Sequence, residues 1–303
     1  MRVVDIHTHG IGGYDTRTIR ADDILKMAQI HGEYGVTDIV PTIYSGPIRV
    51  MKGHMAAVKE AIGIQRSGLS NHRTGRDNSK FTIHNSKFAK IAGVHLEGPF
   101  LNPLKAGALD PTSFQKPSEK TWKSLIEGFE DVVKIVTMAP ETEGALHLIR
   151  TMSDMGMKVN LGHSDATYTE AEKAFHAGAK GITHLFNAMR SIHHREPGLA
   201  GFGLINPYIY VEVIADPFHL HNRTIELIFR VKSHEKIIIV SDSVKDTATV
   251  SVSHAMEDNN KILQGGSTTI AEAVKRLSGL GFHEGMVLEC ISDNPLSYLL
   301  SDL

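Results

Sequence analysis

The chain of 303 residues is predicted to fold as a single (β/α)8 barrel over residues 1–303. Short runs rich in Val and Ile recur along the chain, helix-like stretches separate most of them, and polar side chains follow several runs. A doubly wound open sheet is the alternative, and it would carry a Gly-rich phosphate turn after its first strand. The chain has His7-Thr8-His9-Gly10 at this point, which favours the barrel.

The predicted strands mostly lack strict alternation, as expected for strands buried on both faces of a parallel sheet. They cover residues 3–7, 38–42, 91–96, 133–138, 159–162, 182–185, 210–215 and 237–241. Helical periodicity covers residues 22–34, 48–65, 141–156, 168–177 and 222–231, and helices at 270–280 and 284–291 are expected to close the barrel. The polar stretch 67–90 is expected to be a long exposed loop, and 244–264 is a second polar stretch without a chemical interpretation.

The composition is that of an ordinary globular protein, with 41% hydrophobic and 22% charged residues. The formal net charge of -2 indicates neither a nucleic-acid surface nor a basic membrane patch. We expect no signal peptide and no membrane-spanning segment. The single cysteine, Cys290, excludes an intramolecular disulfide and fits a reducing compartment, so a cytoplasmic location is predicted.

Several of the 18 histidines lie at strand ends, where they could bind a metal. His7 and His9 are two residues apart, so both side chains face the same way from the first strand. Glu97 ends the third strand, and His95 shares its face and is expected to support the site rather than bind metal.

Further metal-binding side chains come at the ends of three later strands. His163 comes at the end of the fifth strand, His184 where the chain begins to leave the sixth, and Asp242 at the end of the eighth. Each one alone could be a polar strand end satisfied by local hydrogen bonds. Together they put His, Glu or Asp at the catalytic face of the barrel, where imidazole and carboxylate ligands suit Zn, Fe, Mn or Co. A bound ion makes a nucleophile of its water, and Asp242 could carry the proton, which predicts metal-assisted hydrolysis.

With these metal-binding motifs the chain resembles the amidohydrolase superfamily, and most closely the N-acetylglucosamine-6-phosphate deacetylase family. The matching motifs run in order over most of the chain. They are Asp5-Ile-His-Thr-His-Gly10, His95-Leu-Glu-Gly-Pro-Phe100, Leu161-Gly-His-Ser164, Thr183-His-Leu-Phe-Asn-Ala-Met189, Arg195-Glu-Pro-Gly198, Ala215-Asp-Pro-Phe-His219 and Ser241-Asp242.

The resemblance implies one or two divalent metal ions. Glu97, His163 and His184 would hold the principal ion. His7 and His9, with Glu97 bridging and Asp242 nearby, would hold a second ion that only some members bind.

The resemblance also implies a substrate and a reaction. Asn187 and Ala188 would meet the sugar or phosphate, His219 would contact the sugar phosphate, and Arg195 would reach the phosphate in a neighbouring subunit, which implies a homodimer. The implied reaction removes the N-acetyl group of an N-acetylhexosamine 6-phosphate by metal-activated hydroxide, with Asp242 as the acid/base. The products are an amino-sugar phosphate and acetate.

Two departures from the family pattern bear on this reaction. Members usually carry one small β-sandwich that is built from a segment before the barrel and a segment after it, and neither segment is expected here. Leu109, in Gly107-Ala108-Leu109-Asp110, stands where the family has a His thought to polarise the substrate carbonyl. Two alternatives therefore stay open: hydrolysis of a different amide or sugar phosphate, and a paralogue that binds a sugar phosphate without turnover.

Overall fold

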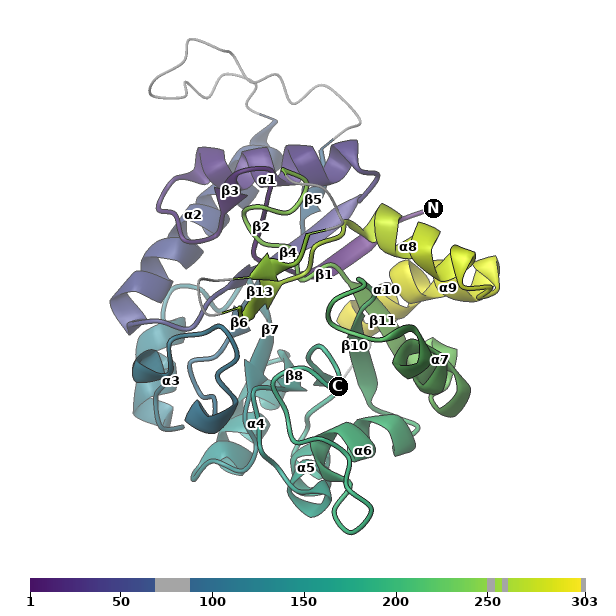
Figure 1. The fold of residues 1–303 in the computed structure, drawn as a ribbon. Coiled ribbons are helices and arrows are strands. Elements are labelled where there is room, and N and C mark those ends of the chain that lie inside the picture. Colours follow the sequence, from purple (N-terminus) through teal and green to yellow (C-terminus); the bar gives the residue numbers. More distant parts are fainter. Residues whose placement is uncertain (69–87, 250–253, 258–260, 301–303) are drawn as a thin grey trace.

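Eight parallel strands form the barrel in the computed structural model, which describes residues 1–68, 88–249, 254–257 and 261–300 (Figure 1). Their order in the sheet follows the chain: β1 (Val4–Thr8), β4 (Asp38–Ile43), β6 (Val94–Glu97), β7 (Val133–Met138), β8 (Lys158–Leu161), β9 (Gly181–Ile182), β10 (Tyr210–Ile214) and β11 (Ile237–Val240). The ring closes between its first and last strands, where Asp242 N donates to His7 O over 2.9 Å and His9 N donates to Ser243 O over 2.8 Å. The predicted fold class is confirmed.

One helix follows each barrel strand, and Figure 1 shows these helices as an outer ring. They are α1 (Ala21–Glu33), α2 (Ile48–Ser67), α3 (Glu119–Ile126), α4 (Ala145–Asp154), α5 (Tyr168–His176), α6 (Gly198–Ile205), α7 (Asn222–Val231) and α8 (Ile270–Gly279). Two more helices, α9 (Glu284–Ile291) and α10 (Asp293–Leu300), come last among the described residues. Thr167 and Thr269 begin α5 and α8 with capping boxes, which satisfy the free N–H groups of the first turn.

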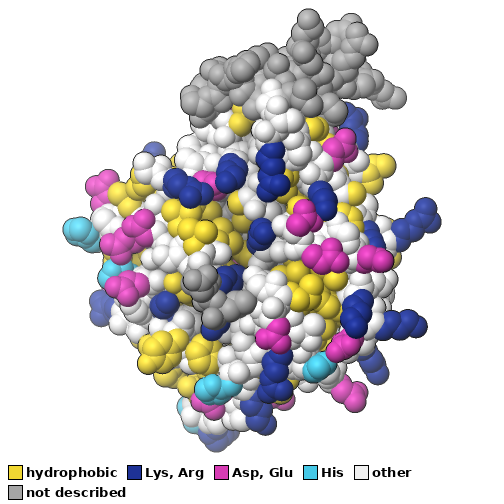
Figure 2. Space-filling model, turned by 180° about the vertical axis from the view of Figure 1, so that it is seen from behind, with side chains coloured by type: hydrophobic (Ala, Val, Ile, Leu, Met, Phe, Trp, Pro, Cys, Tyr) yellow, Lys and Arg dark blue, Asp and Glu magenta, His cyan; other side chains and the backbone are white. Residues whose placement is uncertain are grey.

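The remaining elements are short. Strand β5 (Lys90–Ile91) pairs with β4, and two small hairpins are formed by β2 (Gly10–Ile11) with β3 (Tyr14–Asp15) and by β12 (Met256–Glu257) with β13 (Leu263–Gly265). Three 3-10 turns, η1 (Pro103–Lys105), η2 (Pro111–Ser113) and η3 (His234–Lys236), lie in loops. None of the helices in the described ranges is long and apolar enough to cross a membrane. Figure 2 shows acidic and basic side chains interspersed over one face.

The core has two shells. The larger shell lies between strands and helices, where Ile39 and Leu96 are fully buried with Met55. The smaller shell fills the barrel interior and includes Ile6 and Tyr298. Because the Tyr298 ring of α10 packs on Tyr210 at the start of β10, with centroids 5.1 Å apart, α10 covers the end of the barrel opposite the predicted site.

The structure changes several predicted boundaries. The third strand is split into β5 and β6 at residues 92–93, where the neighbouring segment comes so close that a Cβ on Gly93 would lie 2.7 Å from Val132 O. The fourth helix begins at Ala145 rather than at residue 141, because Gly144 precedes it with a φ of 86°. Helices α3, α6 and α10 were not predicted; α6 is rich in glycine, a poor helix former, and is held by burial. Of the expected loop at 67–90, residues 69–87 lie outside the described residues.

Candidate metal centre

The six predicted ligands converge at the C-terminal end of the barrel, and at most 7% of any of them is exposed. His7 is the fourth residue of β1, His9 follows that strand, and Glu97 is the last residue of β6. The other three lie in the turns just beyond β8, β9 and β11, and these are His163, His184 and Asp242. Five different strands therefore supply the centre.

The first half of the centre consists of Glu97, His163 and His184. Glu97 Oε1 lies 3.1 Å from the Nε2 atom of each histidine, and the two Nε2 atoms are 3.2 Å apart. Three ligand atoms thus surround one small space.

The second half consists of His7, His9 and Asp242. His7 Nε2 lies 3.4 Å from His9 Nε2 and 3.3 Å from Asp242 Oδ1. Glu97 joins the two halves, because its Oε2 is 3.2 Å from His9 Nε2 and its Oε1 is 3.6 Å from His7 Nε2.

The hydrogen bonds of the Nδ1 atoms show that this donor set fits a cation. His9 Nδ1 lies 3.0 Å from Thr42 O, and His163 Nδ1 lies 2.9 Å from Lys105 O. A carbonyl oxygen only accepts, so each neutral ring carries its proton on Nδ1 and turns an Nε2 lone pair toward the oxygens of Glu97. Buried lone pairs that converge in this way repel one another unless a positive charge lies between them, so the residues fit a divalent metal.

Three of the ligands have an unusual backbone. His163, His184 and Asp242 have φ angles of 46°, 30° and 47°, in the left-handed region that residues other than glycine rarely adopt. Such strain is held by surrounding structure and is concentrated at functional sites. Beside Asp242, Gly266 N donates to Asp242 O over 2.7 Å, and a Cβ on Gly266 would lie 1.8 Å from Ser241 O, so only glycine fits this crossing.

The pKa values of the two carboxylates at the centre, Glu97 and Asp242, are shifted in opposite directions. Burial, followed by the charge of Glu97, raises the pKa of Asp242 well above its ordinary value. Burial also acts to raise the pKa of Glu97, but in the absence of a cation the His163 ring takes up a proton instead, and the charge of protonated His163 with hydrogen bonds from the surrounding histidines holds that pKa well below its ordinary value. Glu97 is therefore a permanent anion, whereas Asp242 can take up a proton, as a pair with one acid/base requires.

A cavity of about 410 Å³ opens above the centre. The predicted substrate residues Asn187, Ala188 and His219 line it, and so does Leu109. Arg195 is exposed and is absent from the lining; its guanidinium lies 2.9 Å from the ring of His194.

His219 has a fixed orientation in the cavity wall. Its Nδ1 lies 2.9 Å from Asp216 Oδ2, and Asp216 also accepts from Ser267 N, which holds the carboxylate in place. Burial would raise the pKa of Asp216, but the hydrogen bond from His219 lowers it below its ordinary value. Of the two ring nitrogens of His219, only Nδ1 has a hydrogen bond in the described part of the chain, so its Nε2 can meet a ligand.

Sequence reasoning missed several residues around the centre. Tyr44 stacks on the His9 ring at 3.8 Å, and Arg17 lies 4.3 Å from the Tyr44 ring centre; both line the cavity. Residues 262–264, in the stretch that had no interpretation, and the adjoining Gly265 form part of the cavity wall. Glu212 was missed although it gave a signal, because it is a charged residue in the middle of an otherwise apolar strand.

The comparisons with known proteins agree with this geometry. No family model matches the sequence. The chain is 32% identical over 242 residues to an N-acetylgalactosamine-6-phosphate deacetylase of Escherichia coli O157:H7, covering 80% of this chain and 59% of the relative. It is 33% identical over 245 residues to an N-acetylglucosamine-6-phosphate deacetylase of Vibrio furnissii, covering 81% of this chain and 56% of the relative.

Solved structures give the same family. A variant of N-acetyl-D-glucosamine-6-phosphate deacetylase from Mycobacterium smegmatis, in complex with N-acetyl-D-glucosamine-6-phosphate, superposes with a TM-score of 0.84 at 25% identity, over 98% of this chain and 77% of that one. The N-acetylglucosamine-6-phosphate deacetylase from Thermotoga maritima gives 0.82 at 26% identity, over 98% and 77%.

The barrel and its buried donor set define a class of (β/α)8-barrel proteins with a candidate centre for divalent metal ions. Within this class, the relatives show that the chain belongs to the N-acetylglucosamine-6-phosphate deacetylase family. The chain spans less than two thirds of the length of the two curated relatives.

Proposed function

We propose that the protein hydrolyses the N-acetyl group of an N-acetylhexosamine 6-phosphate to an amino-sugar phosphate and acetate. The observation that carries this proposal is the buried donor set around Glu97, which opens with Asp242 into a cavity of about 410 Å³. Relatives named for both the glucosamine and the galactosamine compound support the substrate class, and we take N-acetylglucosamine 6-phosphate as the first substrate.

One or two divalent ions belong to this proposal. Glu97, His163 and His184 would hold the principal ion, and His7 and His9 with Asp242 would hold the second. Zn, Fe, Mn and Co all accept imidazole and carboxylate ligands. The ion, when bound, lowers the pKa of water and polarises the substrate carbonyl.

Asp242 is assigned the proton transfer. Its carboxylate takes a proton from the attacking water as the bond from water oxygen to carbonyl carbon forms. It gives a proton to the amide nitrogen as the C–N bond breaks, so that acetate and a free amine leave. Its raised pKa supports this role, because the carboxylate then holds a proton more readily than a free aspartate does.

The sugar phosphate would be bound by the cavity wall. Asn187 and Ala188 would meet the sugar or phosphate through amide groups, and His219 would offer its free Nε2 to the phosphate. Arg195 would reach the substrate of the other subunit in a homodimer, which its exposed position allows. A cytoplasmic location is part of the proposal, and it fits the single, buried Cys290.

Replacing Arg195 by Ala tests the phosphate contact. KM for the phosphorylated sugar is expected to rise about tenfold or more, because a charge-assisted bond is lost, whereas the unphosphorylated sugar should be affected little. Light scattering on the same samples should give the mass of a dimer. Equal effects on both sugars would exclude a phosphate contact.

Leu109 favours a second candidate, the same hydrolysis acting on a different amide. Leu109 lines the cavity and cannot donate a hydrogen bond to an oxyanion, and losing one such donor costs roughly 100- to 1,000-fold in rate. If the loss of rate were complete, the protein would bind a sugar phosphate without hydrolysing it.

Acetate release by the purified protein tests the proposal, with metal content measured in the same sample. N-acetylglucosamine 6-phosphate and its galactosamine epimer are compared with an unphosphorylated control. We expect the parent to release acetate from a phosphorylated sugar. The Asp242→Asn variant should release none, although it keeps the metal at the principal site. A metal-loaded protein that is inactive on both phosphates would exclude them as substrates.

A further inference from the structure

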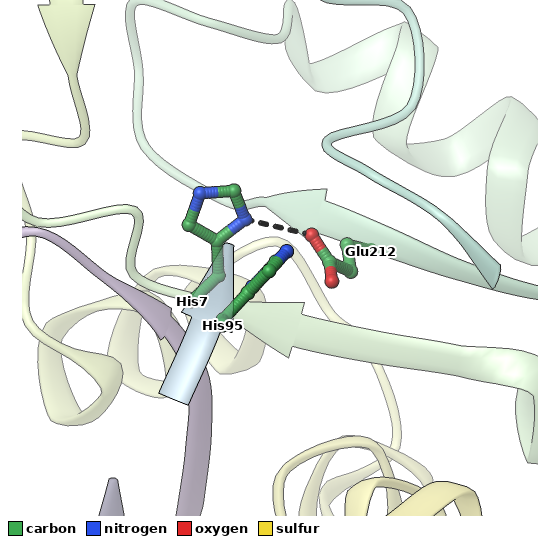
Figure 3. A group of neighbouring side chains, drawn as sticks. All are labelled: His7, His95 and Glu212. Atoms are coloured by element: carbon green, nitrogen blue, oxygen red, sulfur yellow. Dashed lines mark hydrogen bonds and ion pairs between the residues drawn. The ribbon is translucent and has the colours of Figure 1, made fainter. Parts of the chain in front are cut away.

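A layer of polar side chains lies inside the barrel, beneath the metal centre. It contains His95 of β6, Asn160 of β8 and Glu212 of β10, all almost fully buried. Figure 3 shows His7, His95 and Glu212 turned toward one another, with a hydrogen bond between His7 and Glu212. None of these three deeper residues faces the cavity.

Glu212 is held as an acceptor at both of its oxygens. Its Oε2 lies 2.9 Å from His7 Nδ1 and 3.4 Å from the backbone N of His184, and its Oε1 accepts from Asn160 Nδ2 over 2.7 Å. Asn160 Oδ1 in turn accepts from the hydroxyl of Tyr298 on α10. The carboxylate is therefore fixed by partners from three sides.

This arrangement does not suit a further metal site at His7, His95 and Glu212. His95 Nδ1 donates to Ile6 O over 3.1 Å, and its Nε2 lies 2.8 Å from Thr137 Oγ1. With both ring nitrogens in hydrogen bonds, His95 offers no lone pair to a cation.

The bond to Glu212 instead decides which nitrogen of His7 carries the proton. A carboxylate that accepts from Nδ1 leaves the Nε2 lone pair free, and Nε2 is the atom that lies 3.4 Å from His9 Nε2 and 3.3 Å from Asp242 Oδ1. Carboxylates behind metal-binding histidines orient the ring and strengthen it as a ligand.

We propose that Glu212 is a positioning residue that sets the tautomer of His7 and thereby the affinity of the second metal ion. This inference rests on the metal centre of the proposed function. His163 has a backbone carbonyl in the corresponding place, at 2.9 Å from its Nδ1, which no side-chain substitution can remove, whereas the support behind His7 is a side chain that can be replaced while every ligand is kept.

The test is a Zn²⁺ titration of the chelator-treated full chain, without substrate. The parent should bind two ions per chain. In Glu212→Gln the first ion should bind with unchanged affinity and the second about 10- to 100-fold more weakly. Glu212→Asp, which keeps the charge but draws it back by one methylene, should also weaken the second ion.

Thr137→Val is the matched control, because it removes a polar group from the same layer that contacts His95 and Thr183 but not His7. It should leave both affinities unchanged, and thermal melts of the metal-free variants check that each is folded. The inference is overturned if both Glu212 variants bind two ions as the parent does, or if Thr137→Val weakens the second ion equally. If the parent binds only one ion, the inference about Glu212 is wrong but the principal metal site stands. If the parent binds no ion, the proposed metal centre is wrong as well.

Discussion

The two halves of the metal centre are built in different ways. In the first half, His163 and His184 lie in turns beyond β8 and β9, with φ angles in the left-handed region. In the second half, His7 lies within β1, and Asp242 is joined to it by the backbone bond that closes the barrel. Asp242 also has a left-handed φ, of 47°, but its backbone N–H is part of the barrel closure. The first half therefore depends on the shape of two local turns, and the second depends on barrel closure.

The support behind the rings differs as well. A backbone carbonyl, Lys105 O, fixes His163, whereas the side chain of Glu212 fixes His7. His184 Nδ1 is buried and has no hydrogen-bond partner in the described part of the chain. The second half can thus be changed by substitutions far from the cavity, and the first half much less so.

The largest effect is expected from Glu97→Gln, because Glu97 is the one ligand that both halves share. The amide keeps the size but removes the charge between four histidines. Metal content should fall at both sites, and acetate release should fall at least about 1,000-fold, since several kcal/mol of transition-state stabilisation are lost. A variant that keeps two ions per chain would show that the two halves do not share this ligand.

Smaller losses of metal and activity are expected when one ligand is removed from only one half, by His163→Asn in the first half or His9→Asn in the second. The first should lose the principal ion and most of the activity. The second should keep one ion and lose about 10- to 100-fold in rate, because Glu97, His163 and His184 remain in place. Metal analysis and acetate release are measured on both. Loss of the principal ion in His9→Asn, or equal losses of rate, would contradict the division into two halves.

The sequence predicts that these side chains lie close together, and the reason is the topology of the barrel. The C-terminal ends of parallel strands meet at one rim, so His7, Glu97, His163, His184 and Asp242 come together once the strands are known. The spacing of two between His7 and His9 puts both on one side of the chain without further information.

The rest of the centre depends on contacts between distant segments. The contact of Glu212 with His7 joins residues 205 positions apart, and only the closed barrel brings them together. The cavity wall at residues 262–265 depends on the pairing of Ser243 with Gly266, which no local pattern indicates. Strand β9 has only two residues, so His184 falls in a turn rather than at the end of the predicted strand 182–185.

The smallest effect concerns the support of β1 from outside the barrel. His31 of α1 is fully buried, and its Nε2 lies 3.0 Å from Thr8 Oγ1, which is 2.8 Å from Ser243 Oγ at the barrel closure. Burial lowers the pKa of His31 to about 4. The neutral ring is favoured in the folded state, so its contribution to stability is present above the unfolded pKa of about 6.5 and is lost as the pH falls from there toward 4.

His31→Gln removes this titration and keeps a hydrogen-bonding side chain. Between pH 7 and pH 5 the parent should lose about 2 kcal/mol more of its free energy of unfolding than the variant, as measured by urea denaturation at both values. The difference between the two proteins cancels the titration of the other histidines, which both retain. If the parent and the variant lose the same free energy over this interval, His31 is not buried as a neutral ring, and α1 does not support β1 in this way.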